Sequence, residues 1–79
     1  MINVKNKGVI KAVGNRIRDL RIAKGLSQAA LSDEADIPLS QIGRIERGES
    51  NPTISTLYVI AQALKVELPE LVDFKIKKT

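Results

Sequence analysis

The sequence predicts an all-α fold, a compact five-helix bundle, and three observations support this prediction. Apolar residues recur at the spacing of three and four that marks an amphipathic helix through most of the 79 residues. No stretch shows sustained alternation of apolar and polar residues, and no Asn-Gly or Asp-Gly hairpin turn is present. Ser, Thr, Pro and Gly residues stand where such helices would begin or end.

The first two helices are predicted from apolar spacing and from the residues at their ends. The first covers about 8–24 and ends at Gly25, and its inward residues are Ile10, Val13, Ile17 and Leu20. Ser27 is a suitable N-cap for a second helix over 28–35. Asp36, which tolerates left-handed backbone, marks the end of that helix.

Three further helices follow the same logic. A third is predicted over 38–47, with Pro38 in its first turn and Gly48 ending it. Thr53 can cap a fourth helix, whose inward residues would be Ile54, Leu57, Ile60, Ala61 and Leu64. Pro69 fits the first turn of a short fifth helix with the apolar residues Leu68, Leu71 and Val72.

The chain is expected to form one domain over 8–74, preceded by an N-terminal arm, 1–7, and followed by a frayed basic tail, 75–79. No run of about 18 apolar residues is present, and lysines interrupt the opening segment where a signal peptide would be apolar. We therefore expect a cytoplasmic protein without a membrane segment.

Composition narrows the function further. The chain has neither Cys nor His, so we expect no enzymatic activity, no metal site and no cofactor. The segment "GRIERGES", 43–50, imitates a phosphate-binding loop, but Glu49 stands where the lysine should be, so nucleotide binding is rejected. The two aromatic residues, Tyr58 and Phe74, are predicted to pack internally, which argues against a stacking platform for RNA or single strands.

Charge is distributed unevenly along the chain. The net charge is +4, and all of the excess lies in residues 1–47, which hold nine Lys and Arg against five Asp and Glu. Residues 48–79 hold four of each. This asymmetry favours a polyanionic partner on one side of the molecule, although a lysine-bearing N-terminus can also be a solvated tail.

The two short helices predicted on either side of a tight turn would form a helix-turn-helix unit. The segment "SQAALSDEADIPLSQIGRIERGESNPTISTL", with the flanking "IRDLRIAKGL" and "IAQALKVELPEL", resembles the phage-repressor, Cro-like, Xre-type family of helix-turn-helix DNA-binding proteins. The resemblance covers roughly 13–74. It implies a five-helix fold and a transcriptional regulator that binds double-stranded DNA sequence-specifically, with helix 38–47 in the major groove.

Ile42 and Ile45 are predicted to face inward, which leaves the opposite face of helix 38–47 for DNA. Arg44 is the strongest candidate for base readout, because a guanidinium can donate two hydrogen bonds to guanine. By resemblance, the base-contacting residues are Leu39, Ser40, Gln41 and Arg44. The candidates for phosphate contact are Ser27, Gln28, Arg47, Ser50 and Asn51. Glu49 would be unfavourable beside DNA and is expected to point to solvent.

Glu46 follows Ile42 by four residues and so is predicted to lean inward, where an unpaired charge is costly. The resemblance implies that Glu46 pairs with Arg21 of the first helix. The alternative is a surface carboxylate that meets solvent or Arg47. In this family a glycine is usual at the position of Asp36, and Gly43 inside a helix costs about 1 kcal/mol relative to alanine.

One such domain makes few base contacts, so we expect a homodimer on a palindromic operator with half-sites about 34 Å apart. The predicted dimer residues are Leu68, Leu71, Val72, Phe74 and Ile76; the alternative is that they seal the end of the core. A second reading of the whole chain also stays open. The same fold could serve as an antitoxin or adaptor whose main partner is a protein, such as a toxin or the transcription machinery.

Overall fold

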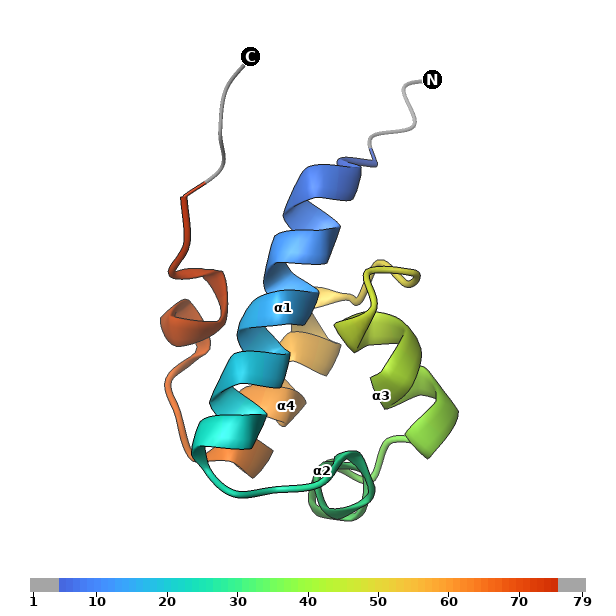
Figure 1. Ribbon diagram of the computed structural model, residues 1–79, viewed down its shortest axis with the longest axis vertical. Coiled ribbons are helices and arrows are strands. Elements are labelled where there is room, and N and C mark those ends of the chain that lie inside the picture. Colours follow the sequence, from blue (N-terminus) through green and yellow to red (C-terminus); the bar gives the residue numbers. More distant parts are fainter. Residues whose placement is uncertain (1–4, 76–79) are drawn as a thin grey trace.

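The computed structural model describes residues 5–75, which form four α-helices and one 3-10 helix and contain no strand (Figure 1). The elements in chain order are α1 (Lys7–Ala23), α2 (Gln28–Ala35), α3 (Leu39–Glu46), α4 (Ile54–Leu64) and the 3-10 helix η1 (Leu68–Val72). The all-α prediction is confirmed. Of the five predicted helices, the first four are α-helices, and the fifth is the 3-10 helix η1.

The fifth predicted helix is wrong in type because the segment is too short for stable α-helix. η1 has five residues with Pro near its start, and the Glu70 side chain accepts a hydrogen bond from the Glu67 amide at 2.9 Å, while the Glu70 amide donates to the Glu67 backbone carbonyl at 3.0 Å. Short segments of this kind commonly adopt the tighter 3-10 geometry.

Local capping chemistry sets most of the helix ends as predicted. The Ser27 side chain accepts a hydrogen bond from the Ala30 amide, and Thr53 does the same for Thr56. Asp36 adopts left-handed backbone with φ of 54° after α2. These contacts satisfy backbone groups that a helix end leaves without partners.

Two helix starts differ from the prediction by one residue. α1 begins at Lys7 because the Asn6 side chain accepts a hydrogen bond from the Val9 amide, so Lys7, which was assigned to the arm 1–7, is helical. α3 begins at Leu39, because Pro38 has ψ of 140° and lies before the first helical residue. Residues 1–4, and the predicted tail except Lys75, lie outside the described residues.

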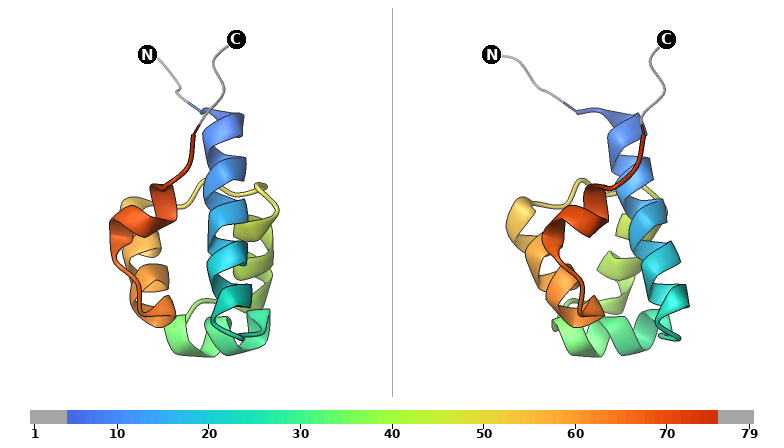
Figure 2. Two further views of the ribbon diagram at one scale, coloured as in Figure 1. Left: turned by 60° about the vertical axis from the view of Figure 1, so that its left-hand side comes forward. Right: turned by 90° about the vertical axis from the view of Figure 1, so that its left-hand side faces the viewer.

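The core lies between α1 and the other elements, with α3 on one side of α1 and α4 with η1 on the other (Figure 2). α1 packs on α3 and η1, and α2 packs on α3 and α4. The largest fully buried side chains are those of Ile17, Leu31, Ile42, Ile45, Ile60, Leu64 and Leu71. The fold is therefore held by branched aliphatic packing, as the absence of Cys required.

Two side chains of α4 contradict their predicted burial. Ile54 is 66% exposed and Tyr58 is 53% exposed, whereas Leu57, Ile60 and Leu64 are buried. Ile54 belongs to the first turn at the edge of the apolar stripe, and Tyr58 lies one turn later on its outer side. Within residues 5–75, no helix combines the length and apolar character that crossing a membrane requires.

α1 and α3 lie in close contact at Gly14. A Cβ atom at this buried glycine would lie 2.3 Å from the Ile45 carbonyl oxygen and 2.9 Å from that of Glu46. No side chain fits in this space, so the glycine allows the two backbones to touch. The position of α3 is thus fixed against α1 by backbone contact as well as by side chains.

Candidate nucleic-acid interface

The two faces of α3 carry different side chains. Ile42 and Ile45 are each 1% exposed and point into the core, which confirms their predicted orientation. On the other face, Leu39, Ser40 and Arg44 are exposed, and Gln41 is half-buried. The outer face therefore presents a guanidinium, a hydroxyl, an amide and an apolar side chain, which together can contact all four base pairs.

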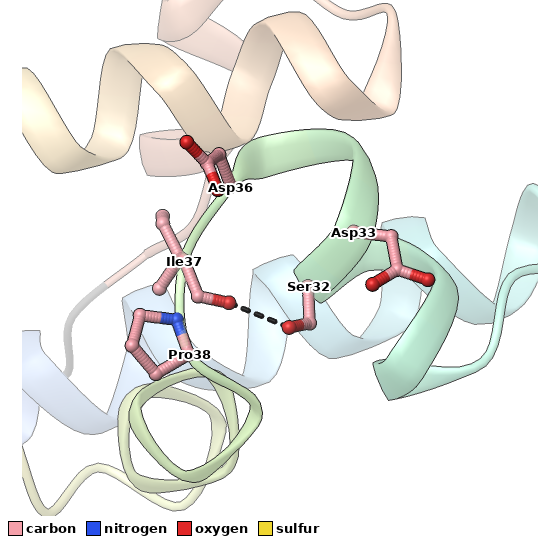
Figure 3. A pocket seen from close by; sticks show the side chains of 5 residues that line it. All are labelled: Ser32, Asp33, Asp36, Ile37 and Pro38. Atoms are coloured by element: carbon pink, nitrogen blue, oxygen red, sulfur yellow. Dashed lines mark hydrogen bonds between the residues drawn. The ribbon is translucent and has the colours of Figure 1, made fainter.

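The turn between α2 and α3 sets the angle between these helices (Figure 3). The Ser32 hydroxyl donates to the Ile37 carbonyl at 2.6 Å, and the Ile37 amide donates back to the Ser32 carbonyl at 3.1 Å. The left-handed Asp36 reverses the chain between them. A shallow hollow beside this turn is lined partly by the Asp33 and Asp36 carboxylates, so it is unsuited to an anion.

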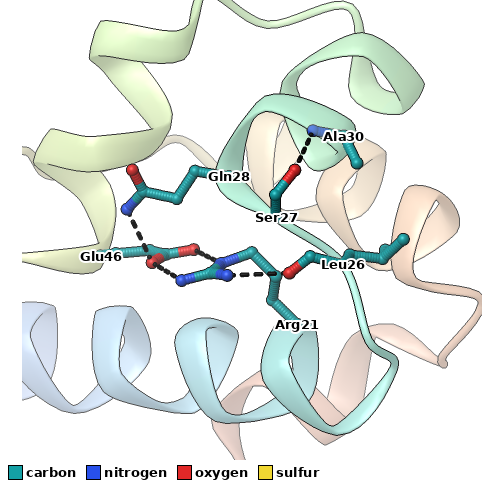
Figure 4. Close-up of polar contacts among 6 residues, drawn as sticks. All are labelled: Arg21, Leu26, Ser27, Gln28, Ala30 and Glu46. Atoms are coloured by element: carbon teal, nitrogen blue, oxygen red, sulfur yellow. Dashed lines mark hydrogen bonds and ion pairs between the residues drawn. The ribbon is translucent and has the colours of Figure 1, made fainter.

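A buried ion pair joins α1 to the end of α3 (Figure 4). Arg21 Nε donates to Glu46 Oε2 at 2.7 Å, and Arg21 Nη2 donates to Glu46 Oε1 at 3.0 Å. The exposed fractions of the two side chains are 11% and 2%. The structure thus contains the pair that the resemblance implied, with the bidentate geometry that suits a guanidinium and a carboxylate.

Two more contacts extend this pair into a network of four segments. Arg21 Nη1 donates to the Leu26 carbonyl at 2.8 Å, and Gln28 Nε2 donates to Glu46 Oε1 at 3.0 Å. The hydrogen bonds with Glu46 raise the pKa of Arg21, so this arginine stays charged. Every buried side-chain nitrogen and oxygen within residues 5–75 has a hydrogen-bond partner.

Arg47 at the end of α3 does not pair with Glu46. Its Nε and Nη2 donate to the two oxygens of Glu49 at 3.0 and 3.2 Å. Both side chains are more than half exposed. Glu49 was expected to point to solvent, and it does so while bound to Arg47.

The remaining candidates for phosphate contact lie at helix ends and in the following loop. Ser27 is exposed and caps α2, and Gln28 is half-buried with one amide hydrogen engaged by Glu46. Ser50 is half-buried and Asn51 is exposed in the loop after α3. Gly48 adopts φ of 75° at the start of this loop and packs against the backbone of Lys11.

The predicted dimer residues do not form one exposed surface. Leu71 is fully buried in the core, so its assignment to a dimer contact is wrong. Leu68 and Phe74 are partly buried against that core, whereas Val72 is 48% exposed. Ile76 lies outside the described residues. The spacing of apolar residues could not predict whether these side chains are buried in the monomer core or contact a second copy, because both arrangements need apolar residues.

Comparison with known proteins bears on this arrangement of α2, turn and α3. The helix-turn-helix family model matches residues 17–71, which is most of the chain and includes both helices. The chain belongs to this helix-turn-helix family. The phage-repressor, Cro-like, Xre-type resemblance seen in the sequence is confirmed by this match.

Individual members of the helix-turn-helix family cover most of this chain. An HTH-type transcriptional regulator of Sinorhizobium fredii is 42% identical over 62 residues, which are 78% of this chain and 80% of that protein. The control protein C.SmaI of Serratia marcescens is 36% identical, over 75% of this chain and 70% of that protein. The crystal structure of the restriction-modification controller protein C.AhdI of Aeromonas hydrophila superimposes with a TM-score of 0.77 at 39% identity, covering 78% of this chain and 94% of that chain.

Two features of this family member were missed by sequence reasoning. The hydrogen bond from Gln28 to Glu46 depends on the angle between α2 and α3, which no local pattern reveals. The close approach at Gly14 had one available signal, a glycine in the middle of an amphipathic helix, where glycine is otherwise unfavourable.

Proposed function

We propose that this helix-turn-helix protein is a sequence-specific, double-stranded DNA-binding transcriptional regulator that places α3 in the major groove. The observation that carries the proposal is the two-sided α3. Two isoleucines and the paired Glu46 hold its inner side, while Arg44 and Ser40 stand free on its outer side. A helix held in this way can present side chains to base edges without rearrangement.

In this proposal the outer side chains divide into two classes. Leu39, Ser40, Gln41 and Arg44 read bases, with Arg44 donating to guanine and Leu39 contacting a thymine methyl group. Ser27, Gln28, Arg47, Ser50 and Asn51 contact phosphates and set the register. The names of the relatives, which are transcriptional regulators and control proteins, support a role in gene regulation.

We also propose that the protein binds as a homodimer, because one α3 spans too few base pairs for useful specificity. The exposed apolar residues of the mutually packed α4 and η1 offer the contact: Ile54, Tyr58 and Val72. The same residues also suit a different protein, so an adaptor or antitoxin that binds a partner protein is the second candidate function.

Selection of bound sequences from random duplex DNA tests the proposed function. The wild type should enrich a sequence with two related half-sites, and Arg44→Ala should lose discrimination at one position of each half-site, worth about 1 to 3 kcal/mol. Arg18→Ala is a matched control, since it removes an exposed arginine of α1 and should leave the enriched sequence unchanged.

The salt dependence of binding separates the two candidate functions. Neutralising several phosphates makes log K fall with log salt by about 0.9 per phosphate. If the wild type enriches no sequence and binds duplex DNA weakly without this slope, the regulator proposal fails in favour of the adaptor.

A further inference from the structure

Glu49 places a negative charge at the edge of the surface proposed to meet DNA. It follows α3 by three residues, and its carboxylate accepts two hydrogen bonds from Arg47, at 3.0 and 3.2 Å. The hydrogen bonds from Arg47, and to a smaller extent the charge of Arg44, lower the pKa of Glu49, so the carboxylate is ionised at neutral pH. Arg47 and Glu49 together thus contribute no net charge toward a phosphate.

The position of the Arg47 guanidinium depends on Gly43. A Cβ atom at Gly43 would lie 2.9 Å from Arg47 Nη1, so the guanidinium folds back along α3 into the space that glycine leaves. Nε and Nη2 are engaged by Glu49, and Nη1 lies beside Gly43. An arginine in this position reaches less far toward the DNA backbone than an extended one.

We infer that Glu49 restrains DNA binding by holding Arg47 in a neutral pair folded over Gly43, so that Arg47 must leave Glu49 before it can contact a phosphate. The inference rests on the proposed function and assigns a role to the one acidic residue of the loop after α3. Glu49 is a positioning residue, because it acts through Arg47 and need not touch DNA.

The size of the restraint follows from exposure. The Arg47 and Glu49 side chains are 58% and 54% exposed, so solvent screens their attraction. Such a pair opens readily and tunes affinity instead of preventing binding. In Glu49→Gln the charge of Arg47 is no longer neutralised, so the salt slope should be steeper by up to roughly 0.9, the value for one more uncompensated positive charge at the phosphates.

A double-mutant cycle on the selected operator tests this role. Glu49→Gln should bind several-fold more tightly than the wild type, with the steeper salt slope, whereas Arg47→Gln should bind more weakly. In the Arg47→Gln background, Glu49→Gln should gain little, because the side chain through which it acts is gone. Glu34→Gln removes an exposed negative charge of α2 that lies near Lys24 and Lys65. This variant should leave the affinity for DNA close to that of the wild type.

Other results would overturn the inference without touching the proposed function. An equal gain from Glu49→Gln in both backgrounds would mean plain repulsion of DNA by Glu49. A loss of sequence discrimination in Glu49→Gln would mean that Glu49 orients Arg47 for readout. If the wild type binds no duplex, the proposed function itself fails. The NMR resonance of Arg47 Nε–H in DNA-free protein then still reports whether the pair with Glu49 exists. This resonance should shift in Glu49→Gln and not in Glu34→Gln.

Discussion

Glu46 and Glu49 lie three residues apart, and each pairs with an arginine, yet their surroundings give the two pairs different weight. Arg21 and Glu46 are almost fully removed from solvent, whereas Arg47 and Glu49 are more than half exposed. Breaking a buried pair leaves an uncompensated charge in a medium of low polarity, while breaking an exposed pair returns both groups to water. The first pair therefore stabilises the fold, and the second is free to serve binding.

Truncation of either partner in the buried pair should be strongly destabilising. We expect Arg21→Ala or Glu46→Ala to lower the free energy of unfolding by about 3 to 5 kcal/mol, because the remaining charge stays buried. Urea denaturation at neutral pH measures this loss. Arg47→Ala, which breaks the exposed pair, is the control and should behave like an ordinary surface substitution; equal losses for both arginines would contradict this assignment.

At the residue scale, part of the network around Glu46 could be predicted from the sequence. The inward lean of Glu46 followed from its spacing after Ile42, and its partner Arg21 followed from the family resemblance. The third member, Gln28, had been assigned only to a phosphate, and its contact with Glu46 comes from the packing of α2 on α3. Contacts between helices depend on crossing geometry, which residue spacing does not contain.

At the scale of elements, two glycines inside helices differ in what surrounds them. Gly14 lets α1 touch the backbone of α3, where a Cβ atom would meet carbonyl oxygens that cannot move aside. At Gly43 the added Cβ atom would meet only the end of the flexible Arg47 side chain. Both glycines carry the same penalty in helix propensity, so their replacement isolates the effect of packing.

The two alanine substitutions should therefore differ in sign. Gly43→Ala should raise the free energy of unfolding, by up to about 1 kcal/mol, because alanine favours the helix and Arg47 can swing away. Gly14→Ala should lower it by several kcal/mol, on the order of an overpacked core, despite the same gain in propensity. Thermal or urea unfolding of both variants measures this contrast, and a stabilised Gly14→Ala would show that α1 and α3 can separate without cost.

Helix ends were easier to predict than helix type or burial. Ser27, Thr53 and Asp36 act through contacts within three or four residues, so the local sequence contains the information. η1 became a 3-10 helix and Ile54 became exposed for reasons of length and coverage by neighbours. Such properties are decided by the assembled bundle, after the local choices have been made.

For the whole molecule, the distribution of apolar surface bears on assembly. The core is closed by Leu71, and the apolar side chains left on α4 and η1 are outside it. The proposed dimer therefore uses Ile54, Tyr58 and Val72 in place of most of the residues first expected from the sequence. These side chains contribute little to the monomer fold, so they can be changed without unfolding it.

The double variant Ile54→Ser with Tyr58→Ser should weaken self-association more than tenfold, since loss of a central interface anchor costs about 2 kcal/mol or more. Sedimentation equilibrium at tens of micromolar measures the dimer population, and circular dichroism checks that the helices persist. Ile22→Ser, which removes an isoleucine of α1 that is 53% exposed, is the control. A wild type that sediments only as a monomer would contradict the homodimer proposal.

The network around Arg21 has a consequence for how such a protein could acquire new targets. Its hydrogen bonds hold α3 through Glu46 on the inner side, and none of them involves Leu39, Ser40, Gln41 or Arg44. The side chains proposed to read the operator can thus change while the turn between α2 and α3, the Arg21–Glu46 network and the core stay the same. If these four residues read the operator as proposed, specificity can change through them alone, because none of them takes part in the network that holds α3.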